Sequence, residues 1–511
     1  MRSDFDLIIV GGGLGGALLA MIARRLGLHT VLVERGSHPR FAIGESSTPL
    51  ANLLLEELAV RYDLPKVASL AKWGTWQRDH PELSVGLKRG FTFYHHEWGR
   101  PLDHPPEGDQ VLMVAASPNE ALADTHWYRP AFDHYLVEEA AALGVEYLDQ
   151  TELNEVEEMT DGIRVQGLRN GKNVSLSAPW LVDATGPRGF LARQLRLESV
   201  RVPGLEGNQG LFAHFTGVRP MGETWGTVPD APYPADAAAT HHCFPGGWIW
   251  VLPFNNGITS AGISACPSLA QELHLSERAD AWNRLLSRLP TVRNQFGDAQ
   301  VVHAFHEAPA LAYQCATASG NRWAMLPSAV GFADPLLSSG FALTLGGIQR
   351  LALAMEKRSP PSVAKLGEYG QAVLRDQEAA NLMVAALHRS LAQPSVFNKL
   401  LMVYFAGVSY AETARRFHRP ELCPGFLLNG RSDFWPRASK LLREGLDGKI
   451  EPAGFDLRVR EIIADINLCD WMRDPHRQCY GVDLDGMIQS WKRFGASATD
   501  ISELSARLGV L

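Results

Sequence analysis

The glycines near the amino end of the chain have the spacing of a phosphate-binding turn. Gly11, Gly13 and Gly16 fit the pattern G-x-G-x-x-G. In this pattern the first glycine permits a tight turn, the second lets the backbone approach a pyrophosphate, and the third lets a helix pack closely on a strand. The amides of Leu14 and Gly15 would point at the phosphates from the amino terminus of that helix. The turn therefore predicts a dinucleotide-binding site.

Elements of the expected kind surround this turn. The apolar run at residues 6–10 predicts a strand, and residues 17–26 predict a helix. Residues 29–34 predict a second buried strand, and Glu34 at its end would accept hydrogen bonds from ribose hydroxyls. A purely structural turn beside a surface glutamate is the alternative, and the agreement of the three elements argues against it. We expect one dinucleotide, and the turn by itself does not distinguish NAD from FAD.

Three further segments carry motifs of their own. Residues 40–49 read RFAIGESSTP, residues 247–253 read GWIWVLP, and residues 331–340 read GFADPLLSSG. With the glycine turn, and in the same order, they resemble the flavin-dependent halogenase family, whose patterns include G-E-S/A-x-x-P, W-x-W-x-I-P and G-F-x-D-P-L-x-S-x-G. Leu252 replaces the isoleucine of the second pattern. The resemblance runs from residue 6 to about residue 353 and selects FAD as the cofactor.

The resemblance implies a chemistry in which FAD is used as FADH2. A separate flavin reductase would supply the reduced flavin, which would react with O2 to give a flavin C4a-hydroperoxide. Chloride or bromide would attack this species and form hypohalous acid. The acid would travel through a tunnel to a lysine that positions it by hydrogen bonding or becomes a haloamine. The electrophilic halogen would then replace hydrogen on an electron-rich aromatic ring.

Lys88 is the residue that matches this lysine, in the run VGLKRGF at residues 85–91. Gly86 and Gly90 on either side bring backbone close, so that the amine can be desolvated and lose its charge more easily. A neutral amine can carry an electrophilic halogen, whereas an exposed ammonium cannot. An ordinary surface lysine is the alternative interpretation. Lys72, between an alanine and a tryptophan, is the competing candidate for the same role.

The resemblance also implies a halide site and a wall between substrate and flavin. The backbone amides of Ser339 and Gly340, ahead of an expected helix, would bind the halide, although an ordinary helix cap would have the same sequence. Trp248 and Trp250 lie two residues apart on an expected strand, so their side chains share one face. They would wall the route to the flavin and keep the substrate from direct contact with it. Two core tryptophans are the alternative.

Four more residues are assigned to the cofactor. Arg40 and Ile43 lie in the segment that follows Glu34. Arg129, at the start of an expected helix, matches an arginine that contacts flavin in related flavoproteins. Asp334, in the loop before the helix at residues 341–355, would lie near the ribityl or phosphate part of FAD.

One departure from the family pattern concerns the substrate. Tryptophan halogenases carry a glutamate directly before the Ser-x-Gly element, and this chain has Leu337 there. The pair Ser46 and Ser47 resembles the branch that acts on phenols and pyrroles. We therefore expect an electron-rich phenolic or pyrrolic ring, either free or tethered to an acyl carrier protein. An aromatic hydroxylase of the flavin monooxygenase type and a non-catalytic flavin-binding protein are the alternatives.

Composition excludes several other classes of protein. Among 511 residues, 46% are hydrophobic and 20% are charged, which is typical of a globular chain rather than a disordered one. The net charge of −8 and the absence of a Lys/Arg block argue against a nucleic-acid partner. The six cysteines form no C-x-x-C pair, so no metal site is expected. No apolar stretch suits a membrane span, and we expect a cytoplasmic protein without a membrane partner.

The order of the expected elements predicts an α/β fold, and the resemblance implies that this fold is of the flavin monooxygenase type. A Rossmann-type FAD-binding domain with a parallel sheet is intertwined with an antiparallel-sheet substrate domain over residues 1–360, and a helical region follows at 361–511. The expected FAD-binding segments are about 1–85, 125–200 and 300–360, and the expected substrate-sheet segments are about 86–124 and 201–299.

Overall fold

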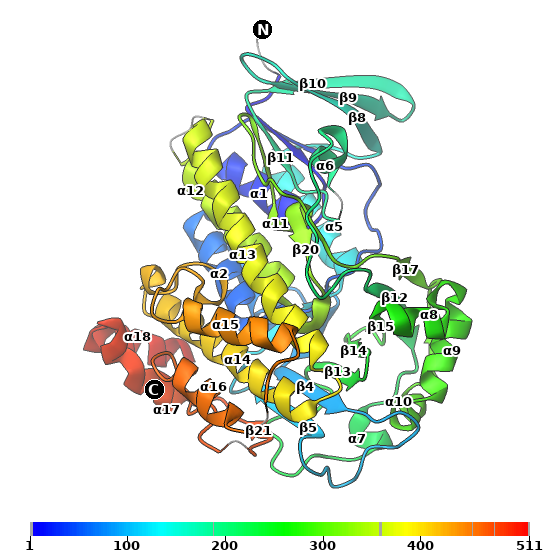
Figure 1. Cartoon of the computed structure of the whole chain (residues 1–511). Helices are drawn as coiled ribbons and strands as arrows, with labels where there is room; N and C mark the ends of the chain where they lie inside the picture. Colours follow the sequence, from blue (N-terminus) through cyan, green and yellow to red (C-terminus); the bar gives the residue numbers. More distant parts are fainter. Residues whose placement is uncertain (1–3, 188, 357–359, 452, 475, 509–511) are drawn as a thin grey trace.

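The computed structural model describes residues 4–508, except 188, 357–359, 452 and 475. Within these residues a five-stranded sheet, parallel throughout, carries the glycine turn. Its strand order is β19 (Trp323–Met325), β11 (Leu181–Asp183), β1 (Leu7–Val10), β2 (Thr30–Val33) and β7 (Glu146–Leu148). The strands come from distant parts of the chain, so this sheet is assembled from several separate segments (Figure 1).

The first β-α-β unit has the form that its sequence predicts. Strands β1 and β2 are buried along their whole length, as parallel strands covered on both faces are. Helix α1 (Leu14–Arg25) connects them and begins at Leu14, three residues before the expected start. Gly15 and Gly16 therefore lie inside its first turn. A Cβ on Gly16 would lie 1.9 Å from the carbonyl oxygen of Gly11, so only glycine permits this close packing.

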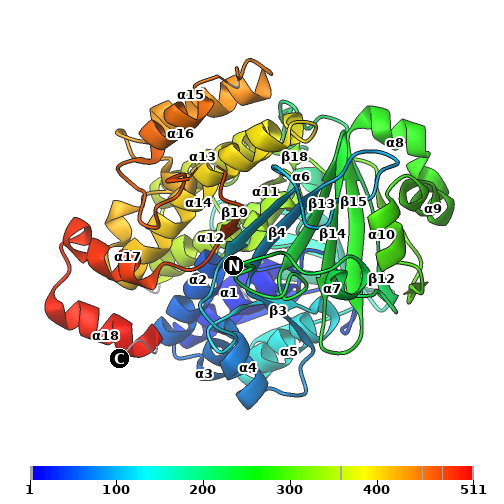
Figure 2. The same ribbon diagram turned by 90° about the horizontal axis from the view of Figure 1, so that it is seen from below.

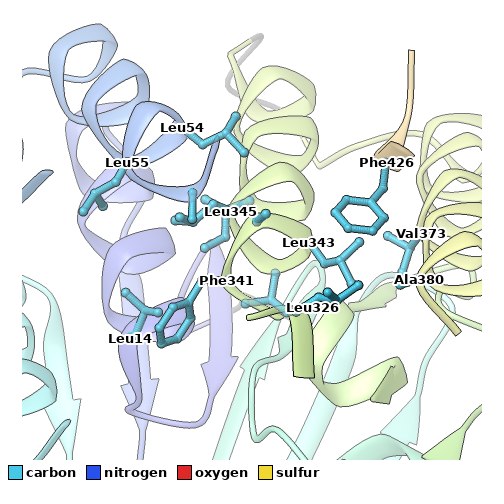
Figure 3. Packing of buried hydrophobic residues seen from close by; sticks show 14 of the residues in the cluster. Leu14, Leu54, Leu55, Leu326, Phe341, Leu343, Leu345, Val373, Ala380 and Phe426 are labelled. Atoms are coloured by element: carbon cyan, nitrogen blue, oxygen red, sulfur yellow. The ribbon is translucent and has the colours of Figure 1, made fainter. Parts of the chain in front are cut away.

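Three further helices fix the turn in place. They are α2 (Pro49–Arg61), α5 (Arg129–Ala142) and α12 (Ser339–Met355). Of these, α5 and α12 pack on α1, and α2 packs on α12. Figure 3 shows Leu14 at the start of α1 beside Phe341 at the start of α12, with Leu345 and Leu54 one turn further along. All four side chains are buried. The amino termini of α1 and α12 are thus held next to each other by apolar packing.

A second, larger sheet lies beside this unit and contains nine strands among the described residues. Most neighbours in it are antiparallel, while β13–β4 and β5–β21 are parallel pairs. Its order is β16 (Gln300–Val301), β12 (Gln209–Thr216), β15 (Thr259–Ala265), β14 (Gly247–Pro253), β13 (Ala239–Phe244), β4 (Gly90–His95), β5 (Val111–Ala115) and β21 (Cys479–Tyr480), with β17 (His306–Ala308) also on β12.

The two faces of this sheet belong to different apolar cores. Helices α8 (Pro267–Leu273), α9 (Ala279–Ser287) and α10 (Pro290–Gln295) cover one face at the outer side of the molecule (Figure 2). Ile249 and Val251 of β14 pack there. The other face, with Trp248 and Trp250, packs in the main core. The two tryptophans therefore share one face of the strand, as their spacing predicts.

Two smaller strand units complete the amino-terminal two-thirds. A ribbon pairs β3 (Val85–Lys88) with β6 (Asp124–Trp127) in antiparallel register. A three-stranded sheet of β8 (Thr151–Glu158), β9 (Ile163–Arg169) and β10 (Lys172–Ala178) lies at one end of the molecule (Figure 1).

The remainder of the chain is mainly helical, as expected. Its helices are α13 (Val363–Arg389), α14 (Pro394–Arg416), α15 (Trp435–Leu446), α16 (Phe455–Ile463), α17 (Leu484–Gln489) and α18 (Ala498–Leu508). Strand β21, within this region, joins the edge of the large sheet beside β5. The six cysteines are free thiols. In the described part of the chain, no helix has the length and apolar character needed to cross a bilayer.

Candidate active site

The glycine turn forms a cradle that two guanidinium groups face. Gly11 has a φ of +109°, and a Cβ at this position would lie 2.5 Å from the carbonyl oxygen of Ala184. A Cβ on Gly13 would lie 3.5 Å from Nη2 of Arg129 and 3.6 Å from Nη2 of Arg40. Oδ2 of Asp133 also lies 3.6 Å from this position, so the absence of a side chain at Gly13 leaves an open space that two guanidinium groups and one carboxylate border at the amino terminus of α1. This space fits the pyrophosphate of a dinucleotide.

Leu14 and Gly15 lie in the first turn of α1, where backbone amides have no acceptor within the helix. Leu14 is buried, and a Cβ on Gly15 would lie 2.9 Å from Cδ1 of Leu326. The side-chain positions of both residues thus face the core. Their amides are the donors that the sequence assigned to the phosphates, and this role stays a prediction.

Glu34 closes the other side of the cradle. Its carboxylate accepts hydrogen bonds from the amides of Gly12 and Gly36, both at 2.9 Å, and from Nη2 of Arg40 at 3.2 Å. Burial by itself would raise the pKa of Glu34, but the guanidinium of Arg40 and the two amides hold this pKa below its ordinary value. Nε of Arg40 is buried without a hydrogen-bond partner. The residues around the turn therefore keep positive charge and donors available for a bound cofactor.

Arg129 connects the cradle to the segment at residues 40–49. Its guanidinium donates to both carboxylate oxygens of Asp133 at 2.7 Å, and its Nη1 donates to the carbonyls of Ile43 at 3.2 Å and Gly44 at 2.9 Å. Burial by itself would lower the pKa of Arg129, but Asp133 holds it above its ordinary value. Ile43 thus contributes its backbone here, and its side chain is exposed.

Asp334 is buried and has four protein partners. Its Oδ1 accepts hydrogen bonds from Nε1 of Trp248 at 3.1 Å and from the amide of Leu336 at 2.9 Å. Its Oδ2 accepts from the hydroxyl of Ser264 and lies 3.1 Å from Nε2 of His388. Burial by itself would raise the pKa of Asp334, but His388 and the other donors hold it below its ordinary value. Asp334 therefore connects the elements that carry these partners, and its direct contact with FAD stays a prediction.

Trp248 and Trp250 belong to a row of neighbouring aromatic rings. The ring centroid of Trp248 lies 5.2 Å from that of His241 and 5.7 Å from that of Trp250. The ring of Phe93 extends this row, with its centroid 4.4 Å from that of His241. Both tryptophans are buried, and Nε1 of Trp250 donates to Ser260 at 3.3 Å. The side chains form a closely packed aromatic layer on the inner face of the large sheet.

Lys88 is completely buried at the end of β3. Its Nζ donates to the hydroxyl of Ser46 at 2.8 Å and to the carbonyl of Ser47, and it lies 4.0 Å from the ring centroid of Phe91. The serine pair of the segment at residues 40–49 therefore holds the amine. Because Arg129 binds Ile43 and Gly44 a few residues earlier, one segment touches both the cofactor cradle and the lysine.

Burial changes the protonation of Lys88. Removing the ammonium from water lowers the pKa of Lys88 to about 7, although the carboxylate of Asp124 acts in the opposite direction. Two buried imidazoles, His126 and His241, also face the amine, and burial lowers the pKa of each. Burial thus favours the neutral amine, the state that can react with an electrophile.

Lys72, the competing lysine, has a different environment. Its Nζ forms an ion pair with Glu56 at 2.8 Å, and about a quarter of the side chain is exposed. Lys72 therefore lies in an ion pair near the surface, whereas Lys88 is fully buried. The geometry therefore favours Lys88 over Lys72.

The halide element lies where α12 begins. Ser338, with a φ of +52°, precedes Ser339 and Gly340, which form the first turn of the helix. A small cavity of about 320 Å³ is lined by Ser339, Gly340, Phe332 and Asp334, among others. Free amides at a helix start beside a cavity can bind an anion. The halide role of these two residues stays a prediction.

A larger cavity of about 670 Å³ lies between the large sheet and the carboxy-terminal region, and Phe91 is part of its wall. Its walls are mostly apolar and aromatic, with a few carboxylates and hydroxyls at its edge. It is lined by Thr48, Pro49, Leu50, Phe91, Val114, Ala115, Ala116, Tyr404, Phe405, Val408, Ser409, Glu412, Cys469, Trp471, Gly481, Val482, Asp483 and Met487. Phe91 thus contacts the Lys88 amine and also lines this cavity.

Three residues of this region escaped the sequence reasoning. Asp124 lies opposite Lys88 in the β3–β6 ribbon. Tyr404 donates from its hydroxyl to the carbonyl of Leu337 at 3.0 Å and so joins the cavity to the halide element. Trp471 stacks on Phe405 with ring centroids 5.9 Å apart. The short run Asp-Thr-His-Trp at 124–127, polar residues in a buried strand, was the available signal for Asp124, whereas Tyr404 and Trp471 carry no motif.

Comparison with known proteins agrees with the geometry of the cradle. The model of a family described as an FAD binding domain matches residues 6–253. This range contains the glycine turn, Glu34, Arg129 and Lys88. The amino-terminal half of the chain thus matches an FAD-binding domain, and it contains most strands of the Rossmann-type sheet.

The relatives define the family more narrowly. The chain is 29% identical over 361 residues to monodechloroaminopyrrolnitrin halogenase PrnC of Pseudomonas fluorescens, covering 70% of this chain and 62% of that protein. It is 30% identical over 357 residues to tetracycline 7-halogenase of Kitasatospora aureofaciens, covering 68% of this chain and 62% of that protein. The chain thus spans 62% of the length of each of these two relatives.

Solved structures show the same fold along nearly the whole chain. The crystal structure of halogenase PltM in complex with phloroglucinol and FAD superposes with a TM-score of 0.82 at 21% identity, covering 94% of this chain and all of that one. The expected α/β fold with a helical carboxy-terminal region is confirmed. The resemblance predicted from the four motifs is also confirmed, because the chain is similar to the halogenases PrnC and tetracycline 7-halogenase over 70% and 68% of its length.

Proposed function

We propose that this protein is a flavin-dependent halogenase that acts on an electron-rich aromatic ring. The observation that carries the proposal is the fully buried Lys88, which Ser46 and Ser47 hold one phenylalanine ring away from an aromatic-lined cavity. The similarity to PrnC and to tetracycline 7-halogenase supports the same activity. A separate flavin reductase is the proposed source of FADH2.

The residues around the cradle would hold FAD. Gly13, Arg40 and Arg129 would bind its pyrophosphate, Glu34 would bind a ribose, and the amides of Ser339 and Gly340 would bind the halide. When bound, reduced FAD would supply the two electrons that bring O2 to the peroxide level, and this oxidant would convert chloride or bromide to hypohalous acid. The protein's own contribution is to separate this oxidation from the substrate by the aromatic layer that contains Trp248 and Trp250.

Lys88 would then deliver the halogen. Ser46 and Ser47 hold its Nζ in place, so the amine needs little reorientation when hypohalous acid arrives. Its neutral form can bind the electrophile by hydrogen bonding or as a haloamine. Buried surroundings exclude water, which would otherwise compete for the reactive halogen.

The large cavity is the proposed substrate site. Phe91, Phe405 and Trp471 offer ring faces for a planar substrate, and offset or edge-to-face contacts between aromatic rings are favourable. Glu412 and Asp483 offer acceptors for an O–H or N–H donor on that ring. These features favour a phenolic or pyrrolic substrate over an apolar one. Leu337, buried where tryptophan halogenases carry a glutamate, supports the same branch.

The test is product analysis by mass spectrometry. The protein is incubated with FAD, NADH, a flavin reductase, chloride or bromide, and a panel of phenols and pyrroles, both free and as carrier-protein thioesters. We expect the isotope pattern of a halogenated product. In Lys88→Met, halogenation should fall by about 100-fold or more, because a transfer group is lost, while FAD affinity stays unchanged.

Lys72→Met is the matched control, because it removes an amine of similar position in sequence but in an ion pair near the surface. It should halogenate at the rate of the unaltered protein. Addition of one oxygen to the substrate, in place of halogen, would identify an aromatic hydroxylase. Full activity in Lys88→Met with loss in Lys72→Met would transfer the role to Lys72. FAD binding without O2 consumption would indicate a non-catalytic flavoprotein.

A further inference from the structure

The small cavity of about 320 Å³ at the halide element is bordered by two helices. Ser339 and Gly340 line it from α12, and Gln377 lines it from α13. Figure 3 shows two apolar residues of the same lining, Leu343 of α12 and Ala380 of α13, on facing sides of these helices. Gln377, to which the proposed chemistry gives no role, therefore shares a cavity with the amides expected to bind halide.

The side-chain amide of Gln377 has one unsatisfied end. Only 2% of this residue is exposed. Its Nε2 donates to Oδ1 of Asn381 at 3.0 Å, whereas its Oε1 is buried without a hydrogen-bond partner. An unpaired buried carbonyl oxygen costs folding free energy, so a residue with a purely structural role gains nothing from an amide here. The unpaired end of Gln377 is thus free to interact with a group bound in the cavity.

Gly331 provides the space that the Gln377 side chain occupies. Its φ of −168° is extended backbone, which any residue can adopt. A Cβ at this position would nevertheless lie 3.0 Å from Cγ and 3.1 Å from Cδ of Gln377, closer than ordinary van der Waals contact. The first glycine of the segment at residues 331–340 therefore packs directly on Gln377.

Gln377 is the last of three side-chain amides that are hydrogen-bonded in a row. Its Nε2 donates to Asn381, and Nδ2 of Asn381 donates to Oε1 of Gln314 at 2.6 Å. Gln314 is half-buried on β18 (Tyr313–Gln314), so water can satisfy its outer end whichever atom is placed there. Half-turns of all three amides exchange oxygen with nitrogen and preserve both hydrogen bonds in the opposite direction. In this reversed row, Gln377 presents Nε2 in place of Oε1 at its free end.

We propose that Nε2 of Gln377 donates a hydrogen bond to the halide, after the row of three amides reverses its direction. The inference rests on the proposed function, in which the amides of Ser339 and Gly340 bind chloride or bromide. The halide would then have a side-chain donor from α13 beside the backbone donors of α12. Reversal transfers no proton and keeps the number of hydrogen bonds within the row.

The charges around the cavity make an additional donor important. Among the described residues that line it, Asp334 carries the only charged side chain, and this charge would repel an anion. The oxygens of Asp334 already accept hydrogen bonds from Trp248, Leu336 and Ser264. Nε2 of His388 lies 3.1 Å from one of them. Neutral N–H groups must therefore hold the halide, and hydrogen bonds to an ion are stronger than those between neutral groups.

The experiment measures halide affinity in two ways. Line broadening in chloride NMR gives the dissociation constant for chloride of the protein with oxidised FAD bound, and initial rates give KM for chloride and bromide in the reconstituted system that halogenates. Gln377→Met keeps the length of the side chain and removes its amide. We expect both constants to rise about tenfold or more, because a hydrogen bond to an ion is lost. The affinity for FAD and kcat at saturating halide should change less than twofold.

Gln314→Glu tests the reversal at a distance from the halide. A carboxylate accepts hydrogen bonds and cannot donate one, so it holds Asn381 and Gln377 in the direction that keeps Nε2 away from the anion. We expect this substitution to raise both constants several-fold, at low and at high concentrations of a salt without halide. Repulsion by the added charge alone would be screened at high salt.

Gln295→Met is the matched control. It also removes a buried side-chain amide, whose Oε1 lies 3.1 Å from Nε2 of His242 in the other apolar core. Gln295 does not belong to the described lining of the halide cavity. Its variant should keep the halide affinity of the unaltered protein.

The outcomes separate the inference from the proposed function. If Gln377→Met binds chloride as tightly as the unaltered protein does, Gln377 is not a halide ligand. If Gln377→Met weakens binding and Gln314→Glu does so only at low salt or not at all, the row does not reverse. If Gln377→Met fails to fold, the partly exposed Gln314→Glu variant decides the inference in the same way.

Two further results concern the role of the site as a whole. Loss of FAD affinity and kcat in Gln377→Met, with an unchanged KM for halide, would show that its role is structural only. Chloride binding that depends on Gln377, in a protein that gives no halogenated product from any ring, would support the inference and contradict the proposed function. Absence of chloride binding in the unaltered protein would overturn the inference.

Discussion

The carboxylate of Asp334 connects three parts of the fold. Trp248 comes from β14, Ser264 from β15 and His388 from α13, and all three converge on this buried side chain. Trp248 therefore donates to a charged acceptor, whereas Trp250 on the same strand donates to the neutral hydroxyl of Ser260. Hydrogen bonds to ionised groups are about twice as strong as neutral ones.

This difference predicts that two similar substitutions lower the free energy of unfolding by different amounts. Trp248→Phe should lower the free energy of unfolding by about 1.5–3 kcal/mol through loss of the bond to Asp334, and Trp250→Phe by about 0.5–1.5 kcal/mol. Urea denaturation followed by circular dichroism measures both. If both variants lose the same free energy of unfolding, the indole of Trp248 stabilises the fold by packing alone. Oxygenation of the substrate by Trp248→Phe but not by Trp250→Phe would show that this anchor maintains the aromatic layer.

Short elements with unusual backbone conformations position the candidate site. Ser338 adopts a φ of +52° directly before α12, a region that glycine tolerates and β-branched residues avoid. Its amide donates to the carbonyl of Pro335 at 2.9 Å. The conformation fixes the direction in which the amides of Ser339 and Gly340 point.

Substitutions at Ser338 should separate stability from halide binding. Ser338→Gly should raise the free energy of unfolding slightly, by up to about 1 kcal/mol, and leave the KM for halide unchanged, because glycine adopts this φ without strain. Ser338→Val should raise the KM for chloride or bromide several-fold, because the loop must shift. Initial rates at varied halide concentration provide the measurement. A normal KM in Ser338→Val would show that the amides of this turn do not bind halide.

The elements around the glycine turn and at the start of α12 show which parts of the structure could be predicted from the sequence. The residue types of Gly11 and Gly16 indicate a tight turn, and β2 ends at Val33, one residue before the expected end, so the first β-α-β unit could be predicted from the sequence. The helix at residues 339–355 was predicted with its start two residues late, because Ser339 and Gly340 resemble a loop. Asp124 could not be assigned, since its meaning depends on pairing with Lys88, and strand pairing between distant residues has no local signal.

At the scale of the whole molecule, the carboxy-terminal region closes the large cavity. Strand β21 pairs beside β5, and Trp471, Asp483 and Met487 line the cavity from the segment around it. The sequence left the role of these helices open, because their residues carry no motif. Their placement follows from long-range packing against α14 and the sheet edge.

Substrate binding should therefore stabilise this region selectively. In hydrogen–deuterium exchange, we expect residues 467–489 to exchange more slowly when an aromatic substrate that the protein halogenates is added. The three-stranded sheet at residues 151–178 lies at the other end of the molecule and serves as the internal control, with unchanged exchange (Figure 1). Equal protection in both regions would indicate a general effect on stability. No protection at 467–489 would place the substrate outside the large cavity.

The opposition of Lys88 and Asp124 on one ribbon has an electrostatic consequence for the interior. One ammonium and one carboxylate together carry no net charge, so the ribbon places a dipole in the interior and not an isolated charge. The field of two opposite charges partly cancels at a distance. The neighbouring aromatic cavity therefore experiences a weaker field than either charged residue alone would create.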